Sequence, residues 1–255
     1  MQLTDAIEKK MQEKEILLMT HLVLGYPSFE ANRKIIAQMV DNGVDLIEMQ
    51  IPFSEPVADG PVIAKANQIS LSSGTRVWEC LQFAEEMIAT HSIPFLFMTY
   101  YNILFKFGVE EFVKEAAEIG IQGFIIPDLP PEEGKDFLAY AKQYKIAPIL
   151  IYAPTSTDER MEKLAGYADG FIYCVARRGV TGAQTSFGPD FDPYIARCRN
   201  AAKMPIAVGF GIREKADIDY LKGKADIAVI GSATITLVDE KGVDAVGDFI
   251  AGLRG

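Results

Sequence analysis

The chain has 255 residues, and its 35 Asp and Glu residues against 25 Lys and Arg residues give a formal net charge of −10. With 49% hydrophobic and 24% charged residues, its composition excludes a disordered or collagen-like chain, and its length suits two average domains or one α/β barrel. The acidic balance argues against nucleic acid and anionic membranes as partners, so a phosphorylated ligand would have to be bound by local geometry.

Short apolar runs alternate with amphipathic stretches along the chain. Eight of these runs end at glycine, proline or polar residues and are too short for helices, which is typical of strands in a parallel sheet covered by helices. The predicted strands begin near Leu17, Leu46, Phe95, Gly123, Pro148, Gly170, Pro205 and Asp226. The predicted helices follow them at residues 29–42, 77–90, 109–119, 132–144, 158–166, 190–202, 214–222 and 243–253.

This alternation predicts an α/β fold, a (β/α)₈ TIM barrel that forms one domain over residues 1–255 with an extra N-terminal helix. An open, doubly wound sheet is the alternative. Such a sheet usually carries a GxGxxG motif after its first strand, whereas residues 24–27 read LGYP. No linker or change in composition divides the chain, so we expect a single domain.

Two connections are unusually long. Residues 52–76, between the second strand and the next helix, include several prolines and glycines, and a loop of this length is usually functional or contains extra structure. Residues 179–189, after the sixth strand, are rich in Gly, Ser and Thr and are a candidate for a mobile lid. Both loops follow the carboxyl ends of strands, where the active sites of such barrels lie.

The second predicted strand gives the strongest functional signal. Because side chains alternate along a strand, Leu46, Glu48 and Gln50 share one face and Ile47, Met49 and Ile51 share the other. The wholly apolar face suits the helix layer, so Glu48 is expected to point into the barrel near its mouth. There it suits general acid–base catalysis, although a buried ion pair or a hydrogen-bonded core glutamate is the alternative.

Other polar residues follow the remaining strands. Asp59, in the loop after the second strand, is either a turn residue or a second carboxylate that shares the catalytic work. Tyr100 and Tyr173 are either packing residues or ligand contacts, and the Arg177–Arg178 pair is either a solvated turn or an anion contact. These alternatives stay open at the level of single residues.

Glycines at the ends of the seventh and eighth strands favour a phosphate site. The two strands end in Gly209-Phe210-Gly211 and Gly231-Ser232-Ala233, each before a short helical segment. In TIM barrels this is where backbone N–H groups and a helix N-terminus bind phosphate. Such a site needs no side-chain cation and therefore suits an acidic protein.

The sequence implies no cofactor or metal. Lysine is absent from the strand ends, which argues against a Schiff-base aldolase, and the three cysteines form no CxxC pair or zinc spacing. Only His21 and His91 are available as histidine ligands. The charged N-terminus is no signal peptide, and no apolar run approaches the roughly 18 residues of a membrane span, so we expect a cytoplasmic protein.

Several motifs in order resemble the tryptophan synthase alpha subunit family. They are residues 48–61 (EMQIPFSEPVADGP), 100–102 (YYN), 178–182 (RGVTG), 209–212 (GFGI) and 231–233 (GSA). The resemblance covers nearly the whole chain and implies a lyase that cleaves indole-3-glycerol phosphate to indole and glyceraldehyde 3-phosphate. It also implies an α2β2 heterotetramer, in which the beta subunit binds pyridoxal phosphate and receives the indole.

Carried onto this sequence, the resemblance implies that Glu48 is the general acid and base. It implies that Asp59 binds the indole N–H, that Tyr173 orients Glu48, and that Thr181 reaches Asp59 when the lid closes. Tyr100 and Phe210 would line the indole pocket. The residues implied to bind phosphate are Gly182, Phe210, Gly211, Gly231 and Ser232.

One departure from the family pattern falls inside the expected site. The family usually has Leu-Gly where this chain has Met49-Gln50. Gln50 would point inward beside Glu48, which predicts a narrower or more polar pocket. The alternatives to the alpha-subunit activity are a stand-alone or substrate-shifted lyase that releases free indole, and a non-catalytic subunit that senses a phosphorylated ligand and activates its partner.

Overall fold

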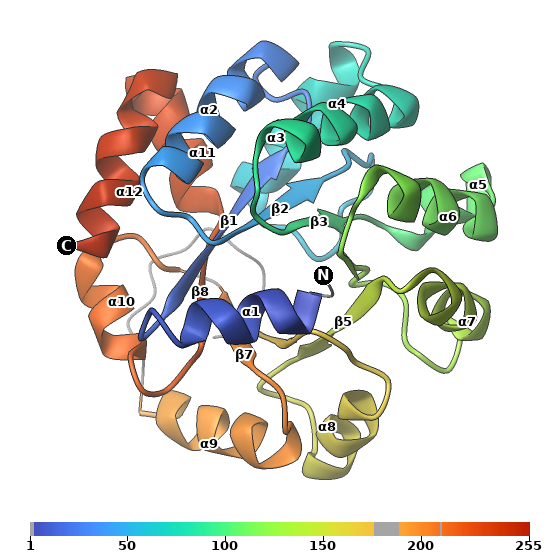
Figure 1. Cartoon of the computed structure of the whole chain (residues 1–255), viewed down its shortest axis with the longest axis vertical. Coiled ribbons are helices and arrows are strands. Elements are labelled where there is room, and N and C mark those ends of the chain that lie inside the picture. Colours follow the sequence, from blue (N-terminus) through green and yellow to red (C-terminus); the bar gives the residue numbers. More distant parts are fainter. Residues whose placement is uncertain (1–2, 176–188, 210) are drawn as a thin grey trace.

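The computed structural model describes residues 3–175, 189–209 and 211–255, and its centre is a closed barrel of parallel strands in sequence order (Figure 1). The strands are β1 (Leu17–Val23), β2 (Leu46–Gln50), β3 (Phe95–Met98), β4 (Gly123–Ile125), β5 (Ala147–Tyr152), β6 (Ile172–Val175), β7 (Ile206–Gly209) and β8 (Ile227–Ile230). Pairing of Leu17 in β1 with Ile227 in β8 closes the barrel. The predicted TIM barrel is confirmed, and the open sheet is excluded.

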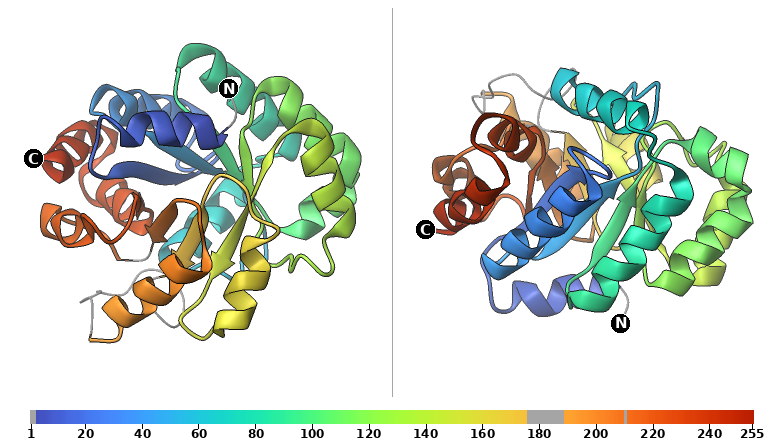
Figure 2. Two further views of the ribbon diagram at one scale, coloured as in Figure 1. Left: turned by 60° about the horizontal axis from the view of Figure 1, so that its bottom comes forward. Right: turned by 90° about the horizontal axis from the view of Figure 1, so that it is seen from above.

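A ring of helices covers the outside of the barrel (Figures 1 and 2). The eight predicted helices are α2 (Phe29–Asp41), α4 (Val77–Thr90), α6 (Val109–Ile119), α7 (Lys135–Tyr144), α8 (Asp158–Ala165), α9 (Phe191–Ala201), α10 (Lys215–Leu221) and α12 (Val246–Arg254). Helix α7 begins later than the predicted residue 132, because the chain first makes a turn in which Glu133 N donates to Pro130 O at 3.0 Å.

Additional helices occupy the long connections and the ends of strands. They are α1 (Leu3–Met11), α3 (Pro61–Ser72), α5 (Tyr101–Phe107), α11 (Ser232–Lys241) and the 3₁₀ turn η1 (Val243–Ala245). Helix α1 is the predicted N-terminal helix. The connection after β2 contains α3, which starts with Pro61 at a position where the missing N–H costs no helical bond. None of the described helices is long and apolar enough to cross a membrane.

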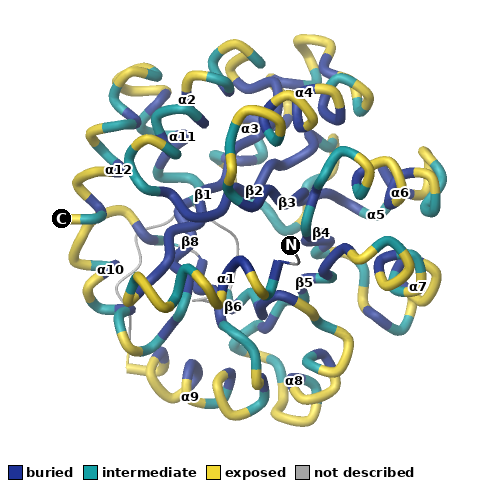
Figure 3. The backbone as a smooth tube through the Cα atoms, viewed as in Figure 1, coloured by how far each residue is buried: buried dark blue, intermediate teal, exposed yellow. Residues whose placement is uncertain are grey.

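Apolar side chains form one layer inside the barrel and another between the strands and the helices. Ile47 and Met49 of β2 and Ile51 just after it pack in the outer layer, whereas Leu46 packs in the inner one. The predicted orientation of β2 is therefore confirmed. Figure 3 shows the strands buried and the outer helical surfaces exposed, as the alternation requires.

Helix α1 fills the amino-terminal end of the barrel, where it crosses the strands in Figure 1. Its Leu3 and Ile7 are buried in the inner apolar layer. Glycines make room for this helix, because a Cβ at Gly123 or Gly170 would lie 3.2 or 2.7 Å from Leu3 Cδ2. Closure of this end leaves the carboxyl ends of the strands as the place for a cavity.

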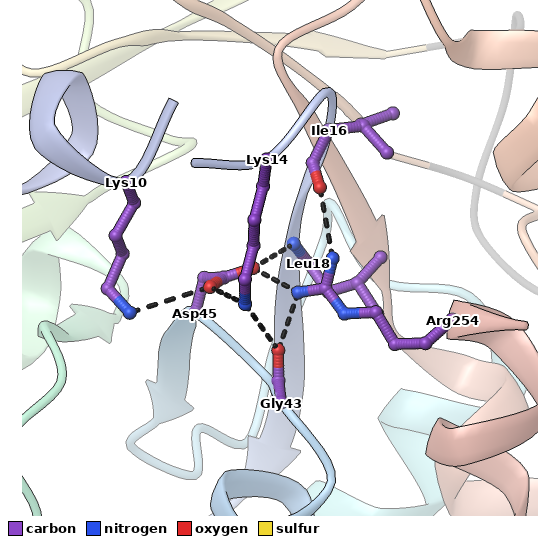
Figure 4. A network of polar contacts seen from close by, with 7 residues as sticks. All are labelled: Lys10, Lys14, Ile16, Leu18, Gly43, Asp45 and Arg254. Carbon is purple, nitrogen blue, oxygen red and sulfur yellow. Dashed lines mark hydrogen bonds and ion pairs between the residues drawn. The ribbon is translucent and has the colours of Figure 1, made fainter. Parts of the chain in front are cut away.

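Asp45, which directly precedes β2, bonds Lys14 near the start of the chain and Arg254 near its end (Figure 4). Its carboxylate accepts hydrogen bonds from Lys14 Nζ at 2.6 Å and Leu18 N at 2.9 Å, and it also pairs with Arg254 of α12. Burial would raise the pKa of Asp45, but these hydrogen bonds and charges outweigh that effect and lower it. The network therefore favours ionised Asp45 in the folded chain.

Candidate active site

A cavity of about 390 Å³ opens among the carboxyl ends of the strands. It collects side chains that lie far apart in the sequence and is largely apolar, with its polar groups on β1, β2 and β6, on the connections after β2 and β5, and at the ends of β7 and β8. The lining residues are His21, Glu48, Val57, Ala58, Asp59, Ile63, Met98, Ile125, Pro127, Ile151, Ala153, Pro154, Thr155, Tyr173, Val175, Gly211, Ile212, Val229, Gly231 and Ser232. An apolar cavity with few polar groups is typical of a small-molecule site.

Glu48 lies inside the barrel and contacts a histidine on the neighbouring strand. The β1–β2 register places His21 beside Glu48, and His21 Nδ1 lies 3.0 Å from Glu48 Oε1. Burial would lower the pKa of His21, but the charge of Glu48 and the hydrogen bond to it raise the pKa, with a further contribution from Asp59. The contact therefore stabilises the protonated form of His21.

Asp59 enters the same cavity from the connection before α3. Its Oδ2 accepts hydrogen bonds from Gln50 Nε2 at 2.6 Å and from Tyr100 Oη at 3.0 Å. Burial raises the pKa of Asp59, and the bonds from Gln50 and Tyr100 and the charge of His21 oppose that rise without cancelling it. The cavity thus brings together two carboxylates, each with its own polar partner.

Gln50 follows Glu48 on the inward face of β2, as the alternation predicts. It is fully buried, its Nε2 donates to Asp59 and lies 3.4 Å from Asn67 Oδ1, and its side chain also contributes to the raised pKa of His21. Gln50 is not among the described residues that line the cavity, and what it contributes to the site is the hydrogen bond that it donates to Asp59.

The two tyrosines of the predicted site occupy different places. Tyr173 lines the cavity, and its hydroxyl lies where a Cβ on Gly209 would be, at 2.3 Å, so β7 needs glycine there. Burial and the nearby charges of Glu48 and Asp59 hold the pKa of Tyr173 well above its usual range. Tyr100 is fully buried behind Asp59, stacked on Phe53 with ring centroids 5.1 Å apart, so it supports the wall instead of lining the cavity.

The ends of β7 and β8 supply backbone groups to the cavity. Gly211 has a positive φ of 99°, and both Gly231 and Ser232 line the cavity at the point where α11 begins. Helix α11 has no side-chain capping bond and no acidic residue in its first turn. None of the described lining residues is Lys or Arg. This arrangement suits an anion held by a helix N-terminus and backbone N–H groups.

Some predicted site residues lie outside the part of the chain that the structure describes. They are Thr181, Gly182 and Phe210, together with Arg177, Arg178 and residues 179–188 of the candidate lid. Their predicted roles stay predictions.

Sequence reasoning missed His21 as a site residue. The β1 residues Leu17 and Met19 pack inside the barrel, and His21 continues that face toward the mouth. The same alternation that placed Glu48 could have placed His21, but every residue of β1 is buried and both of its faces are mostly apolar, so neither face stands out.

Comparisons with known proteins agree on one family. The family described as "Tryptophan synthase alpha chain" matches residues 7–248. A tryptophan synthase alpha chain from Desulfotalea psychrophila is 65% identical over 254 residues, which cover 100% of both chains. The solved tryptophan synthase of Mycobacterium tuberculosis aligns with a TM-score of 0.91 at 31% identity, over 98% of this chain and 96% of that one. A tryptophan synthase complex from Pyrococcus furiosus aligns with a TM-score of 0.85 at 28% identity, over 94% of this chain and 98% of that one.

Proposed function

The chain belongs to the tryptophan synthase alpha chain family, and from this membership we propose that it cleaves indole-3-glycerol phosphate to indole and glyceraldehyde 3-phosphate. This makes it a lyase of tryptophan biosynthesis. The observation that carries the proposal is the cavity itself, in which Glu48 and Asp59 face an apolar space that ends at the backbone groups of Gly231 and Ser232.

The proposed reaction is a retro-aldol cleavage in which Glu48 moves the protons. Glu48 gives a proton to the indole ring carbon that bears the glycerol chain, and it takes one from the adjacent side-chain hydroxyl. The carbon–carbon bond then breaks, its electron pair returns to the ring, and the hydroxyl carbon becomes the aldehyde. Protonation of the ring carbon comes first, because only the protonated ring can accept the electron pair of the breaking carbon–carbon bond.

Asp59 is proposed to stabilise the protonated ring by accepting a hydrogen bond from the indole N–H. Its hydrogen bonds to Gln50 and Tyr100 fix the carboxylate before the substrate arrives, which is how a preorganised site stabilises developing charge. Tyr173 is proposed to help orient Glu48 from β6, and Thr181 to reach Asp59 when the lid closes over the substrate.

The phosphate group is proposed to bind where β7 and β8 end. Backbone N–H groups of Gly211, Gly231 and Ser232 would hold it at the N-terminus of α11, with Gly182 and Phe210 completing the site. No cofactor is proposed for this chain, because proton transfer and a protonated ring are sufficient for the cleavage. The chain is proposed to act in the cytoplasm.

The proposed partner is a tryptophan synthase beta subunit in an α2β2 heterotetramer. This proposal is supported by the tryptophan synthase complexes among the structural relatives. Pyridoxal phosphate would belong to that partner, which would receive the indole.

The direct test measures indole released from indole-3-glycerol phosphate by the purified chain, alone and with a beta subunit. We expect turnover that rises when the beta subunit is added. Equal turnover with and without it would instead favour a stand-alone lyase. No indole in either case, with stimulation of the beta subunit by a phosphorylated ligand, would overturn the proposed activity and favour a ligand-sensing subunit.

A further inference from the structure

His21 and Glu48 form a buried pair at the floor of the cavity. Only 4% of the surface of each residue is exposed, and the facing atoms, His21 Nδ1 and Glu48 Oε1, are 3.0 Å apart. The contact joins neighbouring positions of β1 and β2 in the barrel register. Its geometry is therefore set by the backbone of two hydrogen-bonded strands, which is the rigid support that a site requires.

Each side chain of the pair has a second polar atom that takes no part in this contact. His21 Nε2 and Glu48 Oε2 are both buried, and neither makes a hydrogen bond of good geometry to a described residue, although the side chain of Gln50 lies near enough to His21 to raise its pKa. Buried polar atoms in folded proteins nearly always have a partner, and both of these residues line the cavity. The second oxygen of Glu48 is thus available to a molecule bound in the cavity.

We propose that His21 is a positioning residue that holds Glu48 Oε1, so that Oε2 is the oxygen that exchanges protons with the substrate. An ionised carboxylate can only accept, so Nδ1 carries the hydrogen whenever Glu48 is ionised. Fixing one oxygen orients the other, and the same bond stabilises the ionised carboxylate that remains after proton transfer. This inference rests on the proposed function, in which Glu48 is the general acid and base.

The surroundings of His21 favour its positive form. Its titratable neighbours are Glu48, Asp59 and Tyr173 on the large cavity and Tyr26 on a smaller cavity behind it. Tyr26 in turn donates a 2.5 Å hydrogen bond to Asp239. None of the described residues that line either cavity is Lys or Arg. His21 is therefore the one basic side chain among these described lining residues, and it faces carboxylates.

A ligand-free experiment tests the pair without any reaction. The chain has 2 histidines, so the ¹⁵N signals of His21 can be assigned with a His91→Asn control, since His91 lies between α4 and β3 at the opposite end of the barrel. We expect the Glu48→Gln variant to lower the pH at which His21 titrates. Unchanged titration of His21 in that variant would overturn the proposal.

Kinetics then separate a positioning role from simple packing. His21→Phe keeps a ring but removes the donor, and we expect kcat to fall about 10- to 100-fold with KM changed less than about 3-fold. His21→Asn places an amide N–H near the position of Nδ1, so it should recover most of kcat and lose the pH dependence contributed by the imidazole. If His21→Phe is folded and both its kcat and its pH profile match those of the wild type, His21 does not position Glu48.

The two experiments fail independently. If the wild-type chain releases no indole but His21 still responds to Glu48→Gln, the buried pair stands and the proposed lyase activity falls. If indole is released normally by His21→Phe, the lyase activity stands and the positioning role falls.

Discussion

The amide of Gln50 donates a 2.6 Å hydrogen bond to the carboxylate of Asp59, and this bond joins the strand that carries Glu48 to the connection that follows it. Asp59 receives a second bond from Tyr100. One proposed catalytic carboxylate is thus held by neutral donors and the other by a histidine. The two carboxylates share one cavity but have different environments, which is how two acids in one site can take different roles.

Replacing Gln50 with glycine is expected to move the ionisation of Asp59 to higher pH. Gln50 lowers the pKa of Asp59 against the effect of burial, so its removal lets the pKa rise further. A hydrogen bond to a charged group is stronger than one between neutral groups, so its loss favours the protonated carboxyl. The measurement is the acidic limb of kcat/KM against pH, which should move upward.

Tyr100→Phe serves as the matched variant for Gln50→Gly. It removes the other donor to Asp59, at 3.0 Å, without changing the strand that carries Glu48. The acidic limb should move in the same direction in both variants. A limb that stays in place in both would mean that ionised Asp59 is not required for the reaction.

Glu48→Gln is expected to abolish indole release while phosphate-ligand binding persists. The amide has nearly the same shape as the carboxylate but cannot exchange the proton, and general acid–base catalysis contributes about 10²- to 10⁴-fold. Inorganic phosphate should bind the variant as it binds the wild type, because Gly231 and Ser232 are unchanged. Turnover within about 10-fold of the wild type would remove Glu48 from the mechanism.

Asp45→Asn is expected to destabilise the barrel by about 3 kcal/mol at neutral pH, because it leaves Arg254 and Lys14 facing a neutral group in a buried site. The folded-state pKa of Asp45 is lowered, so its contribution is present above the unfolded-state pKa and is lost as the pH falls through the folded-state value. Urea unfolding should therefore show a gap between wild type and variant at pH 7 that shrinks below about pH 4.

Asp219→Asn is the control for Asp45→Asn. Asp219 pairs with Lys215 and Lys222 on the surface, and its side chain is 44% exposed. Solvent screens an exposed pair and its contribution to stability is small, so this variant should unfold nearly as the wild type does. Equal losses in the two variants would show that burial of Asp45 adds nothing to its contribution.

The barrel could be predicted because its strands are buried on both faces and so form short, continuous apolar runs. The sequence predicted only a short helical segment after Gly231-Ser232-Ala233, and the full length of α11 could not be predicted in the same way. Its Thr234, Ile235 and Val238 are β-branched, favour strands in isolation, and are helical here because they pack in the folded chain. The sequence supports a helix only where periodicity and local propensity agree.

The site residues also differ in how far the sequence alone predicts them. Glu48 could be placed because one face of β2 is wholly apolar and the other is not. His21 does not stand out in this way, because both faces of β1 are mostly apolar, and its pairing with Glu48 depends on the β1–β2 register of the folded barrel. The partner of Asp59 also depends on tertiary structure, since Tyr100 reaches it from the end of β3.

Phosphate binding is expected to depend on the backbone N–H of Ser232 and hardly at all on its hydroxyl. Ser232 is the first residue of α11, where proline is tolerated but lacks the N–H. Ser232→Pro should therefore weaken the binding of inorganic phosphate about 10- to 100-fold, the equivalent of one hydrogen bond to a charged group, whereas Ser232→Ala should bind almost as the wild type does. Because no Lys or Arg is found among the described lining residues, the wild-type affinity should also change little between low and moderate salt. Equal losses in the proline and alanine variants would assign the contact to the hydroxyl, and a steep salt dependence would point to a cationic side chain as the phosphate ligand.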